Sequence, residues 1–182
     1  MKISIFGSAR PLQKDLLYQE AQHLGSLLGS HGFTILTGGY CGTMEAVSKG
    51  VAESGGHVIG VTSREIEHWR PGKANPWVQE EWTKNTLLER IADLIHSCDI
   101  AVGLPGGVGT LTEIILLWNH ILVEIIPAKP IILIGSAWKN IFNLLETELS
   151  DMTNSKDFQH LIYANDCDQA YKIILNHQEH LL

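Results

Sequence analysis

The sequence predicts an α/β fold with a doubly wound, mainly parallel sheet flanked by helices. Three observations predict it: short apolar runs alternate with amphipathic segments, glycine-rich turns follow several of these runs, and 45% of the 182 residues are hydrophobic. Alternating strands and helices form parallel sheets through right-handed crossovers, with helices on both faces. A chain of this length buries most of its apolar surface in one unit. We therefore expect residues 1–182 to form a single Rossmann-like domain.

The strands are predicted from short apolar runs bounded by turn residues. These runs cover residues 3–6, 33–36, 57–61, 100–104, 131–134 and 161–163. The segments between them carry leucine and isoleucine at helical spacings, which predicts helices with one apolar face. The stretch from Ser63 to Trp82 shows neither pattern and contains Pro71 and Pro76. We expect a long loop there that covers the ligand, with tryptophans that either stack on a base or pack inside.

Composition and charge exclude several classes of function. The formal net charge is -7, with 13 Lys and Arg against 20 Asp and Glu, so no broad field attracts nucleic acid or an anionic membrane. Cys41, Cys98 and Cys167 lie far apart, which indicates neither a disulfide framework nor a zinc site. No run is apolar enough to span a bilayer, and the first residues lack the pattern of a signal peptide. We expect a cytoplasmic protein with no metal and no cofactor.

The segment from Leu104 to Glu113 is the most informative motif of the chain. It places three glycines between an apolar run and a helical segment, with a carboxylate one turn further on. Exposed N–H groups at a helix N-terminus attract anions, so we expect a phosphate to bind Gly106, Gly107, Val108, Gly109 and Thr110. Thr110 to Glu113 also fits a helix capping box, which would make Glu113 structural. The glycines favour the ligand, because an ordinary cap needs none.

Two further glycine turns follow predicted strands. They contain Gly7-Ser8 and Gly38-Gly39, and the alternative interpretation of the second is a plain tight turn. Ligands of open parallel sheets bind beyond the carboxyl ends of the strands, where the strand order reverses. We therefore expect Gly7, Ser8, Gly38 and Gly39 to contribute to the same binding site. None of the turns matches GxGxxG, which disfavours a nicotinamide-dependent dehydrogenase.

The segment from residue 116 to 126 is apolar around most of the circumference of a helix. A helix of that kind is usually buried on two sides. We therefore predict a homodimer in which a second subunit covers the outer side. The alternative is that the long loop of this chain covers it.

Two motifs resemble those of the LOG family, the cytokinin riboside 5'-monophosphate phosphoribohydrolases and their bacterial relatives. The segment Pro105-Gly106-Gly107-Val108-Gly109-Thr110-Leu111-Thr112-Glu113 matches the family motif PGGxGTxxE. The segment Gly38-Gly39-Tyr40-Cys41-Gly42-Thr43-Met44 is similar to the family's GGGxxGLM turn, and the resemblance covers nearly the whole chain. Members are often labelled lysine decarboxylases, but this chain has no motif for pyridoxal phosphate.

The resemblance implies a nucleotide-binding enzyme that hydrolyses the N-glycosidic bond of a nucleoside 5'-monophosphate, such as AMP or a cytokinin nucleotide. It implies that Arg90 and Glu113 are the catalytic pair and that Leu87 belongs to the substrate site. By its spacing alone, Arg90 would be a solvated charge on a helix. Only the arginine of the family's MHxRK motif is retained, because Leu87, Leu88 and Ile91 replace Met, His and Lys. Loss of the lysine removes a positive charge near the ligand and bears on substrate identity and turnover.

Such a reaction builds positive charge on the ribose, so Glu113 would either stabilise that charge or activate the attacking water. Arg90 would hold the ribose or phosphate and position Glu113. An alternative from another class is a non-catalytic protein of the same fold family that binds or carries a nucleotide or a phosphorylated cofactor. A third is a structural α/β oligomer without a ligand.

Overall fold

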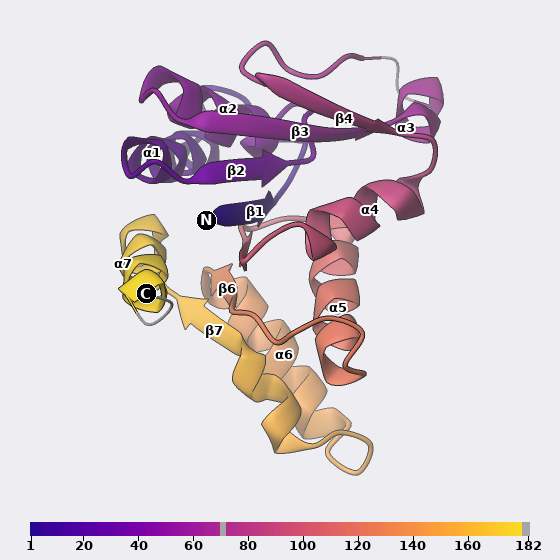
Figure 1. The fold of residues 1–182 in the computed structure, drawn as a ribbon. Coiled ribbons are helices and arrows are strands. Elements are labelled where there is room, and N and C mark those ends of the chain that lie inside the picture. Colours follow the sequence, from indigo (N-terminus) through magenta and orange to yellow (C-terminus); the bar gives the residue numbers. More distant parts are fainter. Residues whose placement is uncertain (70–71, 180–182) are drawn as a thin grey trace.

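The computed structural model describes residues 1–69 and 72–179, in which strands and helices alternate along the chain (Figure 1). The strands are β1 (Lys2–Phe6), β2 (Thr34–Thr37), β3 (His57–Ser63), β4 (Glu80–Lys84), β5 (Ile100–Gly103), β6 (Ile131–Ile134) and β7 (Leu161–Ala164). The helices are α1 (Leu16–Ser30), α2 (Thr43–Glu53), α3 (Arg64–Trp69), α4 (Leu87–His96), α5 (Val108–Leu122), α6 (Ser136–Glu148) and α7 (Cys167–Glu179), with a 3-10 helix at Ser155–His160.

The seven strands form one sheet in the order β4-β3-β2-β1-β5-β6-β7, and every described pairing is parallel. The chain begins in the middle of the sheet, runs outward to β4 and then crosses to the other side of β1. The strand order therefore reverses between β1 and β5, which is where open sheets of this kind bind ligands. The predicted doubly wound, Rossmann-like α/β fold is confirmed.

Helices cover both faces of the sheet (Figure 1). Helices α1, α2 and α7 pack with Ile3 and Ile5 of β1 in one core cluster. Helices α4, α5 and α6 pack with Phe6 and with Leu133 of β6 in the other. Because the central strands are buried on both faces, they appear in the sequence as continuous apolar runs. This is why the five inner strands of the described sheet could be predicted, together with β7, an edge strand that is itself apolar.

The stretch from Ser63 to Trp82 is not the long irregular loop that the sequence predicted. It contains α3 and the start of β4, while Pro71 of the predicted loop lies outside the described residues. Strand β4, of sequence EEWTK, is an edge strand, and among the described strands it pairs with β3 alone. Edge strands tolerate charged residues. Because β4 lacks an apolar run, the sequence pattern did not predict this strand.

The helical segment predicted up to residue 126 ends earlier, since α5 stops at Leu122. Glu124 adopts a φ of 58°, a left-handed conformation that a helix does not continue. In the part of the chain that the structure describes, no helix has the length and the apolar character needed to cross a membrane.

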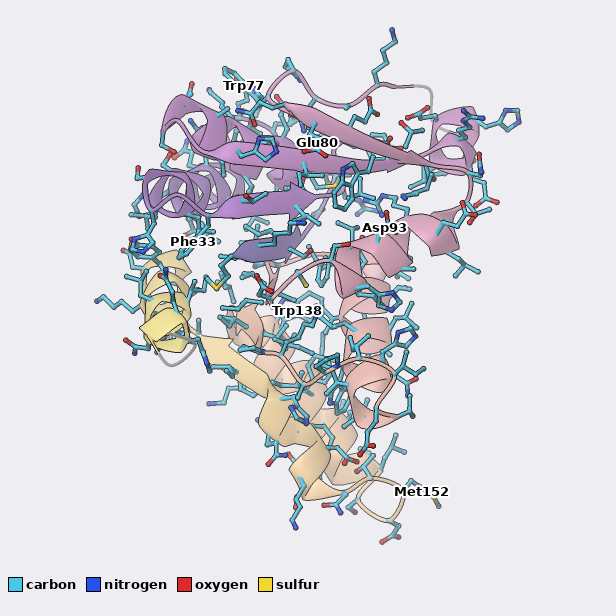
Figure 2. The ribbon with its side chains drawn as sticks, in the orientation of Figure 1. Phe33, Trp77, Glu80, Asp93, Trp138 and Met152 are labelled. Atoms are coloured by element: carbon cyan, nitrogen blue, oxygen red, sulfur yellow. The ribbon has the colours of Figure 1, made fainter. Side chains whose placement is uncertain are left out.

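Trp138 of α6 anchors the loop that follows β5. Its indole is buried, and Nε1 donates a hydrogen bond of 3.1 Å to the Leu104 carbonyl (Figure 2). Because a buried carbonyl that loses its donor keeps its desolvation cost, we expect Trp138→Phe to lower the free energy of unfolding by about 1–3 kcal/mol. Urea denaturation measures this. Met152, which is 83% exposed at the tip beyond α6, provides the control, because Met152→Ala should leave the free energy of unfolding unchanged (Figure 2). Equal stability of the Trp138→Phe and wild-type proteins would contradict the anchoring role.

Candidate functional site

The three glycine turns lie at the carboxyl ends of the adjacent strands β2, β1 and β5. Gly7, in the turn after β1, lies close to residues next to the other two turns. A Cβ added at Gly7 would collide with Thr43 Oγ1 and would lie 3.4 Å from Leu104 Cβ. The turn after β1 thus touches the start of α2 and the loop after β5. The structure brings the three predicted turns together at the reversal point of the sheet.

The loop after β5 opens α5 with uncovered backbone. The N-cap residue of α5 is Gly107, so no side chain caps the first N–H groups of the helix. A Cβ on Gly106 would collide with the Thr110 side chain, which accounts for that glycine by internal packing. Beyond the adjacent residues and the backbone of α5 itself, a Cβ added at Gly107 or Gly109 would meet no described atom within 4 Å, and neither residue has a positive φ, so packing against the described chain does not require glycine at either position. Both residues are exposed, and their N–H groups belong to the start of α5, where backbone donors lack partners within the helix and the helix dipole is positive.

Arg90 of α4 is buried, so the solvated helix charge that its spacing indicated is wrong. Only 5% of the residue is exposed. Its Nε donates to the Val61 carbonyl at 2.8 Å, and its Nη1 donates to Glu113 Oε1 at 3.1 Å. A capping box formed by Thr86 and Glu89 fixes the start of α4. The first turn of the helix is thereby fixed, with Arg90 directed into the protein.

Glu113 of α5 completes a buried ion pair with Arg90. The capping-box interpretation of Thr110 to Glu113 is wrong, because the N-cap is Gly107, the helix begins at Val108 and the carboxylate pairs with α4 instead. Glu113 is 8% exposed. Burial raises the pKa of this carboxyl above its ordinary value of 4.5, and the positive charge and hydrogen bond of Arg90 oppose that rise. The acid lies three residues after Thr110, one turn along the same helix face.

Gly38 and Gly39 shape the space around Arg90. A Cβ on Gly38 would collide with Arg90 Nη2 and with Met44 Sδ, so a side chain there would displace the guanidinium from its present position. Gly39 has a φ of +77°, and its N–H donates to Thr37 Oγ1 at 3.1 Å. Contacts and backbone angles within the chain therefore account for glycine at both positions. Contact of these glycines with a substrate stays a prediction.

Ser8 and Leu87 also have partners within the protein. The Ser8 carbonyl accepts hydrogen bonds from Thr43 N at 2.8 Å and Thr43 Oγ1 at 3.1 Å. The Leu87 N–H donates to Glu65 Oε2 at 2.7 Å, which ties α3 to the start of α4. The Leu87 side chain is 41% exposed. Of the tryptophans predicted to stack or pack, Trp69 is exposed on α3, whereas Trp77 and Trp82 are partly buried.

Two residues around Arg90 were not predicted from the sequence. The ring centroid of Tyr40 lies 5.8 Å from Arg90 Cζ. Asn75 is buried and donates from Nδ2 to the carbonyls of Gly39 and Tyr40, each at 3.0 Å. Tyr40 occupies an unspecified position of the glycine motif, and Asn75 lies in the stretch predicted to be irregular, so neither carried a sequence signal. Across residues 1–69 and 72–179, no group of three or more His, Cys, Asp or Glu side chains is placed to hold a metal ion.

Comparison with curated proteins finds relatives that are named as phosphoribohydrolases. The chain is 29% identical to the cytokinin riboside 5'-monophosphate phosphoribohydrolase of Mycobacterium marinum over 119 residues, 65% of this chain and 62% of that protein. The chain therefore matches less than two thirds of that relative's length. It is 27% identical to the cytokinin riboside 5'-monophosphate phosphoribohydrolase LOG of Oryza sativa subsp. japonica over 170 residues, 90% of this chain and 67% of that protein.

Comparison with solved structures supports the fold. The molybdenum cofactor binding protein of Rippkaea orientalis has a TM-score of 0.73 and 22% identity, over 96% of this chain and 95% of that chain. The molybdenum cofactor carrier protein of Chlamydomonas reinhardtii has the same TM-score and identity, over 96% of each chain. At these identities the likeness shows a common fold.

The family follows from a match that covers almost the whole chain. The family model described as the SLOG cluster4 family matches residues 1–171, which include all three glycine turns, Arg90 and Glu113. This chain belongs to the SLOG cluster4 family.

Proposed function

We propose that this protein hydrolyses the N-glycosidic bond of a nucleoside 5'-monophosphate, AMP-like or cytokinin-like, and releases the free base and ribose 5-phosphate. The observation that carries the proposal is the buried pair of Arg90 and Glu113, one helical turn beyond the open N-terminus of α5. The named activity of the curated relatives supports it.

The phosphate would bind at the start of α5. Backbone N–H groups from Gly106 to Thr110 are the donors, and the open space at Gly107 and Gly109 admits phosphate oxygens close to the backbone. A phosphate held there places the attached ribose further along the helix, toward Glu113. Binding energy from the phosphate then positions the sugar for reaction.

Glu113 and Arg90 would act on the ribose. Water adds to the anomeric carbon while the bond to the base nitrogen breaks, and the departing nitrogen takes up a proton. The ionised Glu113 carboxylate either stabilises the positive charge that develops on the sugar or accepts the proton of the water. Arg90 keeps this carboxylate ionised and oriented through the Nη1 hydrogen bond.

A second candidate function is non-catalytic binding or carriage of a nucleotide or another phosphorylated cofactor. Two observations favour it: the fold matches molybdenum cofactor binding and carrier proteins, and Ile91 occupies the position of the family lysine. Ile91 is 3% exposed and packs in the core beneath α4, so this position supplies no positive charge. The homodimer also stays a prediction.

Removing the charge of Glu113 should separate the two functions. We expect Glu113→Gln to lower kcat for AMP about 10²–10³-fold, as for the loss of one electrostatic group that stabilises a transition state, while AMP still binds. Chromatography of released adenine and calorimetry with AMP measure the two effects. Glu148→Gln, at an exposed position on α6, is the control. Binding of AMP without adenine release by the wild-type protein would favour the carrier.

The pH dependence should report the raised pKa of Glu113. Activity requires the ionised carboxylate, so kcat/KM falls as the pH drops through this pKa. Because burial raises the pKa, the acid limb should have its midpoint above 4.5, the ordinary value for glutamate. A profile of kcat/KM between acid and neutral pH tests this, and a midpoint at or below that value would argue against Glu113 as the acid-limb group.

Alanine at Gly109 should separate ligand binding from folding. Gly109 is helical and its Cβ would meet open space, so we expect Gly109→Ala to keep or raise the unfolding free energy, by up to about 1 kcal/mol. The methyl group would stand where phosphate oxygens approach, and AMP affinity should fall about tenfold or more. Adenosine, which lacks the phosphate, is the matched control ligand. Unchanged AMP affinity would place the phosphate elsewhere.

A further inference from the structure

Tyr40 lies against the catalytic pair without belonging to it. It sits in the turn between β2 and α2, and its half-buried ring faces Arg90, with 5.8 Å between Arg90 Cζ and the ring centroid. A guanidinium at this distance is attracted by the ring. Arg90 thus has an aromatic neighbour in addition to its hydrogen bonds to Val61 and Glu113.

The Tyr40 hydroxyl is held at the end of β3. Its Oη accepts a hydrogen bond from Ser63 N at 2.9 Å and donates one to the Ser63 carbonyl at 3.2 Å. Ser63 lies two residues after Val61, whose carbonyl accepts the hydrogen bond from Arg90 Nε. The same strand end therefore holds the Tyr40 ring and one edge of the guanidinium.

The backbone of the turn is fixed as well. Asn75 donates from its backbone N to the Gly39 carbonyl at 2.7 Å, and its side-chain Nδ2 bonds to the carbonyls of Gly39 and Tyr40. With 8% of Asn75 exposed, these hydrogen bonds are shielded from water. Tyr40 is therefore restrained both at its backbone and at its hydroxyl.

We propose that Tyr40 is a positioning residue whose clamped ring holds the Arg90 guanidinium in the orientation that presents Nη1 to Glu113. The arginine side chain is long and has several rotatable bonds, so a single hydrogen bond at Nε does not by itself fix the orientation of the planar guanidinium. The ring on one side and the Glu113 carboxylate beyond Nη1 restrict that swing. Loss of the ring would weaken the support that Arg90 gives to the ionised carboxylate.

Nearby charges affect the pKa values of Glu113 and Tyr40, which bears on what a pH titration reports. The positive charge of Arg90 on α4 lowers the pKa of Glu113 on α5. The negative charges of Glu67 on α3 and Glu81 on β4 raise the pKa of Tyr40, whereas Arg90 lowers it. The effect of Tyr40 on turnover rests on the proposed function, whereas its effect on the titration of Glu113 does not.

The experiment compares Tyr40→Leu and Tyr40→Phe with the wild-type protein. One readout is the ¹³C-carboxyl NMR titration of Glu113 in the unliganded protein, assigned with Glu113→Gln. The other is kcat and KM for AMP over a range of pH. Tyr171→Leu, at a partly buried tyrosine on α7 that bonds to His31, is the matched control.

We expect Tyr40→Leu to move the Glu113 titration and the acid limb to higher pH and to lower kcat about tenfold, with KM changed less than about threefold. Tyr40→Phe keeps the ring but loses the hydroxyl clamp, so its shifts should be smaller and in the same direction. Tyr171→Leu should change neither readout. A merely structural role for Tyr40 would lower stability without moving the titration.

Unchanged Glu113 titration in folded Tyr40→Leu protein would overturn the positioning role. If Tyr40→Leu does not fold, Tyr40→Phe decides: a shift to higher pH supports the proposal, and no shift overturns it. If the wild-type protein releases no base from any nucleoside monophosphate, the proposed hydrolase fails. The titration of Glu113 then still decides the role of Tyr40 on its own.

Discussion

The ion pair between Arg90 and Glu113 is the constraint on which the site depends. Taking two charges out of water costs several kcal/mol for each ion, and this cost is offset only when the geometry is good and the other donors find partners. The direct contact is a single hydrogen bond of 3.1 Å, so the pair needs support. Arg90 Nε also donates to the Val61 carbonyl, the Tyr40 ring lies 5.8 Å from Arg90 Cζ, and Gly38 leaves room for Nη2.

The sheet order makes this pair possible. Helices α4 and α5 cover the same face, so Arg90 and Glu113 approach each other although 23 residues separate them. Strand β3 ends beside Arg90, and β5 leads into the loop that opens α5. Trp138 then ties that loop to α6 through the Leu104 carbonyl. The same reversal of strand order that marks the binding edge therefore also supplies the parts that hold the ion pair.

The sequence predicted those features of the fold and the site that depend on neighbouring residues in the chain. Buried strands appear as apolar runs, and the glycine motif indicated an open start of α5 and an acid one turn later. The exposed edge strand β4 has no such run and was missed. The burial of Arg90 was also beyond local reasoning, because its spacing fits a solvated face and its partners come from β3 and α5. Tyr40 and Asn75 act through contacts between distant segments, which no spacing reveals.

The glycines of the site divide into two groups that a motif cannot distinguish. Gly7, Gly38 and Gly106 have neighbours that a side chain would strike, and Gly39 has a φ of +77°, so the chain itself accounts for these four. Gly107 and Gly109 have open space and ordinary backbone angles, so nothing in the described residues accounts for glycine at these two positions. A bound phosphate would account for it in a hydrolase and in a carrier alike. Under the proposed function, what separates the hydrolase from the carrier is the ionised Glu113 carboxylate, whose ionisation the charge and hydrogen bond of Arg90 favour.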